Sequence, residues 1–287
     1  MSNTTFTLQN GERVERHTHF DRLLVTWKGE RGLRLHASVL QMGTWSPEVM
    51  LCMWDEGAQT GSRATWDGGR VDHDLVTAPG STSYRIRLEG EGPCLVAISP
   101  LGPPTYRHFF SDAHTLLANF KGHSQMALNH ARNGDLCLPT SLAAATSYLT
   151  GKPADPIAFA TQTYDTEHDI FGNWTLGASQ ANTLLPKGMM WRACRLSSFS
   201  EIYDHLAASR PVVVTVKGEL PGAPLPYKEG HVMVVIGWDG ERVICMDPAF
   251  PSDEETRVAY PYADFIKAWR DRGQYAITLE ETPGSHV

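Results

Sequence analysis

The sequence contains no long hydrophobic run. A helix needs about 20 consecutive, mainly apolar residues to cross a bilayer, and the 287 residues of this chain include no such stretch. The opening segment, MSNTTFTLQNGERVERHTHF, also has no apolar core between a basic start and a small-residue cleavage site. We therefore expect no membrane span and no secretory signal, and we predict a cytoplasmic protein.

An excess of positive charge is also absent. The chain has 32 acidic and 25 basic side chains, a net charge of −7, so neither nucleic acid nor an anionic membrane is expected as its main partner. It has no glycine-rich phosphate loop and no paired-cysteine zinc spacing, and HTH at residues 17–19 is typical of any polar strand. We expect no cofactor and no metal. The five cysteines are widely separated and are expected to be free thiols: Cys52, Cys94, Cys137, Cys194 and Cys245.

Helical periodicity is missing from residues 1–104, where short strands are predicted instead. Apolar and polar residues alternate through LRLHASVL at residues 33–40, and turn pairs such as Asp67-Gly68 and Pro79-Gly80 separate the runs. This pattern predicts an antiparallel β-sandwich, jelly-roll-like. Its tryptophans could bind a substrate or partner, but packing in the core is the stronger alternative: Trp27, Trp45, Trp54 and Trp66.

A stiff linker, Leu101-Gly102-Pro103-Pro104-Thr105, follows the predicted strands. After it the pattern changes to mixed helices and strands. We therefore predict two domains, a β-sandwich at residues 1–104 and a second domain at residues 105–287, which should fold separately.

Cys137 lies where a loop turns into a predicted helix. Pro139 is tolerated in a first helical turn, Thr140 and Ser141 can cap free amides, and Gly151 supplies the stop. The residues between them form one apolar stripe: Leu138, Leu142, Ala145, Tyr148 and Leu149. The positive end of a helix stabilises a thiolate and raises its nucleophilicity. Cysteine is also among the most buried residue types, so simple packing is the alternative.

A predicted hairpin downstream supplies a base and a carboxylate. His231 opens the apolar run Val232–Ile236, Asp239-Gly240 forms a turn, and the second strand ends at Asp247. Antiparallel pairing brings the two ends together, so the imidazole can take a thiol proton while the carboxylate holds its other nitrogen. Gln125, twelve residues before Cys137, could join the Cys137 backbone N–H as an oxyanion donor.

The remaining pattern predicts helices near residues 155–164, 178–185, 200–208 and 262–270, and strands at 212–216 and 275–279. Ser198 is a predicted N-cap, and the continuous β-branched run at 212–216 is typical of a central buried strand. A cysteine on a helix and a histidine on a sheet give an α+β arrangement with a cleft between the two.

These residues carry a family resemblance. The pattern Gln125, Cys137-Leu138-Pro139-Thr140-Ser141, Gly172-Asn173-Trp174, Gly230-His231 and Asp247-Pro248 resembles the papain-like cysteine peptidases related to the bacteriocin-processing, double-glycine leader peptidases. The similarity covers roughly residues 113 to 280 and implies a papain-like fold. It implies Cys137 as nucleophile, His231 as base, Asp247 as orienter and Gln125 as oxyanion donor.

The resemblance also implies substrate-binding residues. It suggests that Asn173 and Trp174 belong to the substrate groove, although an ordinary loop anchored by a buried tryptophan is an equal alternative. Relatives often have glycine directly after the cysteine, whereas this chain has Leu138. A branched side chain there would narrow the cleft. This argues against a preference for double-glycine substrates more than against the peptidase chemistry.

Two classes of function remain. The first is a cysteine peptidase, or an acyl transferase with the same triad, acting on a peptide or protein through an acyl-enzyme at Cys137. The second is a binding protein in which the papain-like domain is an inactive scaffold. The presence of all four expected residue types favours the enzyme. The sequence does not indicate the oligomeric state.

Overall fold

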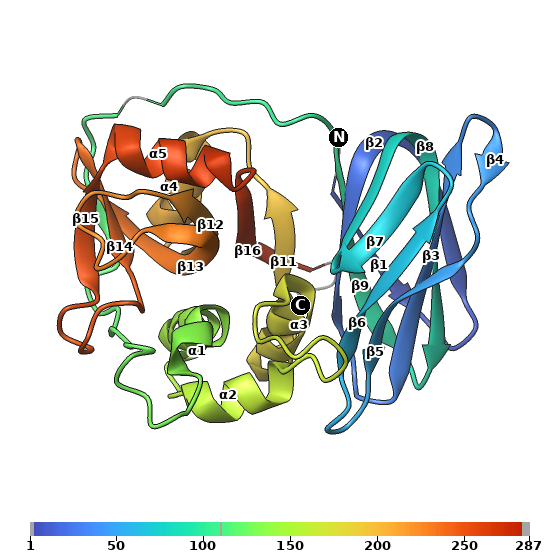
Figure 1. Ribbon diagram of the computed structural model, residues 1–287, viewed down its shortest axis with the longest axis horizontal. Coiled ribbons are helices and arrows are strands. Elements are labelled where there is room, and N and C mark those ends of the chain that lie inside the picture. The colour runs from blue at the N-terminus through green and yellow to red at the C-terminus, as the bar shows by residue number, and fades with distance from the viewer. Residues whose placement is uncertain (1–2, 110, 283–287) are drawn as a thin grey trace.

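The computed structural model describes residues 3–109 and 111–282, which form an all-β part and an α+β part beside each other (Figure 1). The predicted fold class, an antiparallel β domain followed by an α+β domain, is confirmed. Within the described residues, no helix is both long and apolar enough to span a membrane.

Nine antiparallel strands build the N-terminal part, in the order β1-β9-β2-β8-β7-β6-β5-β3-β4. The long strand β8 pairs with β2 and β7 and also with β3, so the sheet folds over itself around one core. The strands are β1 (Thr4–Leu8), β2 (Arg13–Lys28), β3 (Leu33–Gln41), β4 (Thr44–Trp45), β5 (Val49–Trp54), β6 (Thr60–Trp66), β7 (Gly69–His73), β8 (Leu75–Gly90) and β9 (Cys94–Leu101).

Large side chains fill this N-terminal core. Trp27 and Trp54 are buried and meet edge to face with ring centroids 5.7 Å apart. Trp45 instead lies under the Arg85 guanidinium, and Trp66 is only partly buried. The core also receives one residue from the second domain, Leu176, which is fully buried among the β-strand side chains.

The second domain has a sheet of order β11-β16-β12-β13-β14-β15, with β10 pairing with β13. Its strands are β10 (Thr115–Leu116), β11 (Met189–Arg195), β12 (Val212–Gly218), β13 (Tyr227–Trp238), β14 (Arg242–Met246), β15 (Arg257–Pro261) and β16 (Tyr275–Glu281). Its helices are the 3₁₀ turn η1 (Asn133–Asp135), α1 (Cys137–Thr150), α2 (Pro156–Thr163), α3 (Trp174–Leu184), α4 (Phe199–Ala207) and α5 (Tyr262–Asp271).

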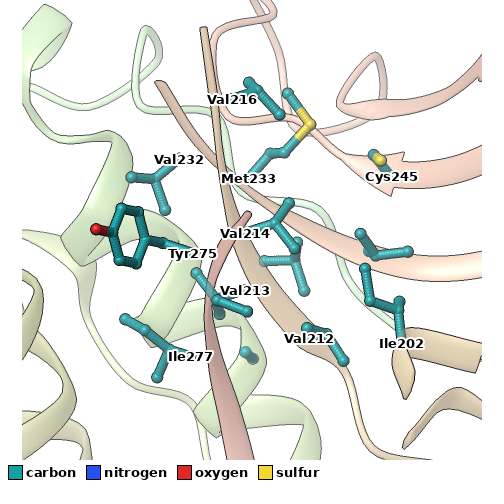
Figure 2. Packing of buried hydrophobic residues seen from close by; sticks show 14 of the residues in the cluster. Ile202, Val212, Val213, Val214, Val216, Val232, Met233, Cys245, Tyr275 and Ile277 are labelled. Carbon is teal, nitrogen blue, oxygen red and sulfur yellow. The ribbon is translucent and has the colours of Figure 1, made fainter. Parts of the chain in front are cut away.

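Helices cover both faces of this sheet. Figure 2 shows Val213, Val232 and Ile277 on one side of strands β12, β13 and β16, and Val212, Val214 and Val216 on the other side, toward Ile202 of α4. Because successive side chains of a strand point to opposite faces, a strand buried on both faces needs an unbroken apolar run. This explains why Val212–Val216 contains no regular polar alternation.

The sequence predicted most elements of this domain correctly, with one shifted boundary. Helix α3 begins at Trp174 rather than Ala178, because the Asn173 side chain accepts a hydrogen bond from Leu176 N at 3.1 Å and caps the helix. Strands β10, β11 and β15 were not predicted. The Ser198 N-cap is confirmed, since its hydroxyl accepts from Ser200 N.

Polar contacts join the two parts. The Lys28 ammonium of β2 donates to the carbonyls of Leu185, Pro186 and Met189. Arg192 of β11 donates in the opposite direction, to the carbonyls of Thr4 and Ile98. The proposed boundary at residue 104 therefore separates two units that are closely attached.

Candidate active site

Cys137 is the first residue of α1, and the structure confirms this helix from Cys137 to Thr150. Gly151 ends it in the left-handed conformation, with φ 67°. No side chain caps the N-terminus: Ser141 donates instead to the carbonyl of Val232 at 3.2 Å, and the Thr140 hydroxyl has no partner within the described residues. The expected capping by these two residues is therefore wrong, and the first amides of α1 are not used by a capping side chain.

His231 lies near the start of the central strand β13, and its Nε2 is 2.8 Å from Asp247 Oδ1. Asp247 directly follows β14, which pairs with β13 as the sequence predicted. The Cys137 side chain is also a neighbour of the imidazole and contributes to raising its pKa. Because Nε2 faces Asp247, Nδ1 is the ring nitrogen left for the thiol. The structure thus brings together three of the residues singled out by the sequence.

Two buried tyrosines hold the other carboxylate oxygen. The hydroxyls of Tyr227 and Tyr260 each donate to Asp247 Oδ2 at 2.6 Å, and Ala249 N donates to Oδ1 at 3.0 Å. The Tyr227 ring also stacks on the His231 imidazole, with centroids 4.1 Å apart and planes 16° from parallel. Neither tyrosine was predicted. No local signal indicated the stacking of Tyr227 on His231, because four residues of a regular strand span about 13 Å and the register of β12 with β13 shifts between these two positions.

The charges of this cluster stabilise one another. Burial acts to lower the pKa of His231, but the Asp247 carboxylate and the Cys137 side chain raise it well above its ordinary value. Burial likewise acts to raise the pKa of Asp247, but His231 and the two tyrosine hydroxyls hold it below its ordinary value. A raised pKa makes His231 a strong acceptor for a proton, and the ionised Asp247 stabilises the imidazolium that forms when the proton is taken.

Gln125 lies beside the Asp247 segment, since its backbone N donates to Pro248 O at 2.9 Å. Its side-chain Nε2 donates to the carbonyls of Asn133 and Gly134 at 3.0 and 2.8 Å, and its Oε1 is buried without a partner among the described residues. Both amide protons therefore hold the 3₁₀ turn that leads into Cys137. Donation to an oxyanion would require one of these bonds to be exchanged.

The three residues expected to bind substrate have different positions. Leu138 is fully buried, with its side chain close to Gly177 of α3, so the expectation that it narrows the cleft is wrong: it presents no surface to a ligand. Asn173 is buried and caps α3. Trp174 is 8% exposed and lines a cavity at the junction of the two domains.

The other four cysteines differ from Cys137. Each is buried, whereas Cys137 is partly exposed, and burial raises the pKa of each of these four thiols: Cys52, Cys94, Cys194 and Cys245. Cys137 is therefore the accessible thiol among the five, and it is the one next to a histidine.

Most of the second domain is similar to known proteins. Residues 117–277, more than half of the chain, match the Peptidase_C39 like family. A crystal structure of a protein described as a C39-like peptidase from Bacillus anthracis aligns with a TM-score of 0.46 and 21% identity, covering 60% of this chain and 99% of that one. None of the curated proteins matches the chain.

Proposed function

The chain belongs to the Peptidase_C39 like family, and on this premise we propose that it is a cysteine peptidase that cleaves a peptide bond through Cys137, His231 and Asp247. The observation that carries the proposal is the position of His231: its Nε2 is 2.8 Å from Asp247 Oδ1, and the Cys137 side chain is near enough to raise the pKa of the imidazole. A nucleophile, a base and an orienting carboxylate in hydrogen-bond sequence are what acyl transfer needs.

In the first half-reaction, the thiol proton moves from Cys137 Sγ to Nδ1 of His231. The thiolate then attacks the substrate carbonyl carbon, forming a C–S bond and placing negative charge on the carbonyl oxygen. The Cys137 backbone N–H at the start of α1 can donate to this oxygen. When the tetrahedral intermediate collapses, the C–N bond breaks, His231 gives its proton to the leaving amine, and an acyl-enzyme remains.

The second half-reaction reverses these roles. His231 takes a proton from water, the resulting hydroxide attacks the thioester carbonyl, and the C–S bond breaks to release the acid and the Cys137 thiolate. Asp247 stays ionised throughout and fixes the ring through Nε2. The tyrosines that donate to its second oxygen keep this carboxylate from rotating.

A peptide library tests the proposal directly. A mixture of tryptic peptides is incubated with the protein, and new termini are identified by mass spectrometry. We expect cleavage by the wild type and none by Cys137→Ala. Cys245→Ala serves as the matched control, because it removes a buried thiol outside the triad and should leave cleavage detectable.

Thiol labelling gives a second test that needs no substrate. Exposure alone would make Cys137 the fastest cysteine to react with iodoacetamide, so the informative comparison is between wild type and His231→Ala. A thiolate held by His231 should react much faster near pH 7 in the wild type. Equal labelling of Cys137 in the two proteins would argue against the triad.

A further inference from the structure

A cavity of about 370 Å³ lies where the two domains meet. Strands β2, β7 and β8 of the sandwich supply one wall, and the other comes from the start of α3 and the segment between α5 and β16. Its lining includes three arginines, a buried carboxylate and two aromatic rings: Arg22, Arg70, Arg272, Asp74, Trp174 and Tyr275. Its volume is in the range of small-ligand pockets, about 300–1,000 Å³.

The cavity is adjacent to the catalytic histidine. Arg272 packs against the residue before His231: a β-carbon placed on Gly230 would lie 2.9 Å from Arg272 Nε. The Arg272 guanidinium lies over the Trp174 ring, with Cζ 5.2 Å from the ring centroid. The Trp174 and Tyr275 rings are in contact, with centroids 4.8 Å apart. A continuous set of contacts therefore runs from Gly230, the residue before His231, into the cavity.

In the part of the chain that the structure describes, the arginines of the cavity form no close ion pairs, and Arg272 only feels the charge of the nearby Asp74. Among residues 3–109 and 111–282, none of the Arg22, Arg70 and Arg272 guanidiniums forms an ion pair, and the exposed Arg70 side chain donates no hydrogen bond. Arg22 donates to the hydroxyl of Tyr275 at 2.6 Å. Arg272 is held by the Trp174 ring.

The two carboxylates in the lining are already occupied. Asp74 accepts a hydrogen bond from Trp174 N at 2.7 Å. Asp72 lies 3.4 Å from Arg63 Nε and 3.0 Å from His73 Nδ1, and it is largely exposed. Guanidinium groups offer paired N–H donors that match the two oxygens of a carboxylate. The free donors in this cavity thus suit an anionic ligand group.

We propose that this cavity is a subsite of the peptide-binding groove and that it receives a carboxylate of the substrate through Arg22, Arg70 and Arg272. The inference rests on the proposed peptidase function. A carboxylate can come from the C-terminus of the peptide or from an aspartate or glutamate side chain, and both sources share the same recognition chemistry. In either case the sandwich contributes directly to substrate selection, because Arg22 and Arg70 belong to it.

Three affinity labels separate these possibilities. Ethyl epoxysuccinyl-alanylalanine is prepared as the free acid and as the carboxamide, and ethyl epoxysuccinyl-alanylaspartate as the carboxamide. In each case the Cys137 thiolate opens the epoxide, a C–S bond replaces a C–O bond, and the alkoxide takes a proton from His231. The second-order rate constant of Cys137 alkylation is measured by mass spectrometry at low ionic strength.

We expect the free acid to react about tenfold or more faster than the neutral amide, because a hydrogen bond to a charged group contributes about 1.5–3 kcal/mol. If the aspartate-containing amide shares this advantage, a side-chain carboxylate is accepted; if it does not, the subsite is specific for the C-terminus. The acid-to-amide ratio should fall toward one in Arg70→Gln and remain high in Arg70→Lys. Arg107→Gln, which removes an exposed charge outside the cavity, is the matched control and should keep the wild-type ratio.

Two results would count against the proposal in different ways. Equal rates for acid and amide, with Cys137 alkylation still dependent on His231, would overturn the carboxylate subsite and leave the peptidase proposal standing. Alkylation that is unaffected by His231→Ala would overturn the peptidase proposal itself, and the subsite with it.

Discussion

At the scale of single residues, Asp247 receives the most support in the site. It accepts from His231, two tyrosine hydroxyls and one backbone amide. In Asp247→Asn the amide N–H can face Nε2 of His231 and impose the wrong tautomer, so turnover should fall by about 10⁴-fold. The measurement is the initial rate of peptide cleavage, with the urea midpoint as a control for folding. Cleavage within a factor of two of wild type would contradict the assigned role.

The two tyrosines act through Asp247. Donation to Oδ2 stabilises the ionised carboxylate and helps to hold the pKa of Asp247 below its ordinary value in the folded state. The ionised group therefore contributes to the free energy of unfolding at pH values above its unfolded pKa of about 3.9. This contribution is lost as the pH falls through the pKa of the folded state. Tyr260→Phe should raise the folded pKa and move this loss to higher pH. Urea unfolding over a series of pH values measures this shift, and Cys137 alkylation over the same series measures the effect on the site.

Tyr227 has a second role that a phenylalanine can preserve. Tyr227→Phe keeps the ring stacked on His231 and should behave like Tyr260→Phe, whereas Tyr227→Leu should slow alkylation further because the imidazole loses its packing partner. If the phenylalanine and leucine variants react alike across the pH range, the stacking contributes nothing measurable.

Gln125 has two possible roles that kinetics can separate. Peptide cleavage passes through an oxyanion, but alkylation by iodoacetamide does not. If Gln125 donates to the oxyanion, Gln125→Ala should lose about 3 kcal/mol in cleavage and little in alkylation. An equal loss in both reactions would mean that Gln125 acts only by holding the carbonyls of Asn133 and Gly134 before Cys137.

The residue pattern predicted Cys137, His231 and Asp247 because helix starts and hairpin ends are readable from local sequence. It did not predict Tyr260, which reaches Asp247 from β15, since no local pattern indicates which strand will lie beside β14. It misplaced Leu138 because burial depends on the packing of α1 against α3.

At the scale of elements, helix α3 depends on the sandwich for part of its N-terminus. Asp74 accepts from Trp174 N, and burial raises the pKa of Asp74 to about 6. The folded state therefore binds a proton more tightly than the unfolded state, so stability falls as pH rises from about 4 to 6. Asp74→Asn keeps an acceptor for Trp174 N and should flatten this pH dependence.

Urea unfolding at pH 5 and pH 7 measures the effect of Asp74→Asn. The matched control is Asp21→Asn, because Asp21 also accepts a backbone hydrogen bond, from Gly80 N at 2.9 Å, away from the junction. A pH dependence in Asp74→Asn as large as in the wild type would show that Asp74 is not responsible.

Helices with clear caps, stops or apolar spacing in the sequence were predicted well, whereas some strands without a regular apolar pattern were missed. Helices α1, α2, α4 and α5 have caps, stops or clear apolar spacing, and the structure confirms them. Strand β11 has the sequence MMWRACR. It was missed because Arg192, one of its two arginines, is buried, and a buried arginine interrupts the apolar pattern that indicates a strand. Arg192 is accommodated there by Glu280 and by carbonyls of the sandwich, which only the tertiary structure supplies.

At the scale of the whole molecule, the two domains share side chains. Leu176 of α3 completes the sandwich core, so the expectation that the halves fold separately conflicts with the packing. Leu176→Ala should destabilise the chain by about 2–5 kcal/mol. It should also lower the hydrogen-exchange protection of the sandwich strands, because Leu176 is part of their core.

Leu142→Ala is the matched control for this prediction. Leu142 is equally buried, but in the core of the α+β domain, so its loss should spare the sandwich strands at exchange times shorter than global unfolding. Unchanged protection of the sandwich in Leu176→Ala would favour independent domains after all.

The shared leucine also sets an order of events during synthesis. Domains generally form from the N-terminus as the chain is made, at about 5–20 residues per second. The last strand of the sandwich ends at Leu101, but Leu176 comes 75 residues later. Until that segment is translated, the nascent sandwich exposes the apolar surface that Leu176 will cover. This chain should therefore be most prone to aggregation, or to capture by chaperones, in the seconds before α3 is complete.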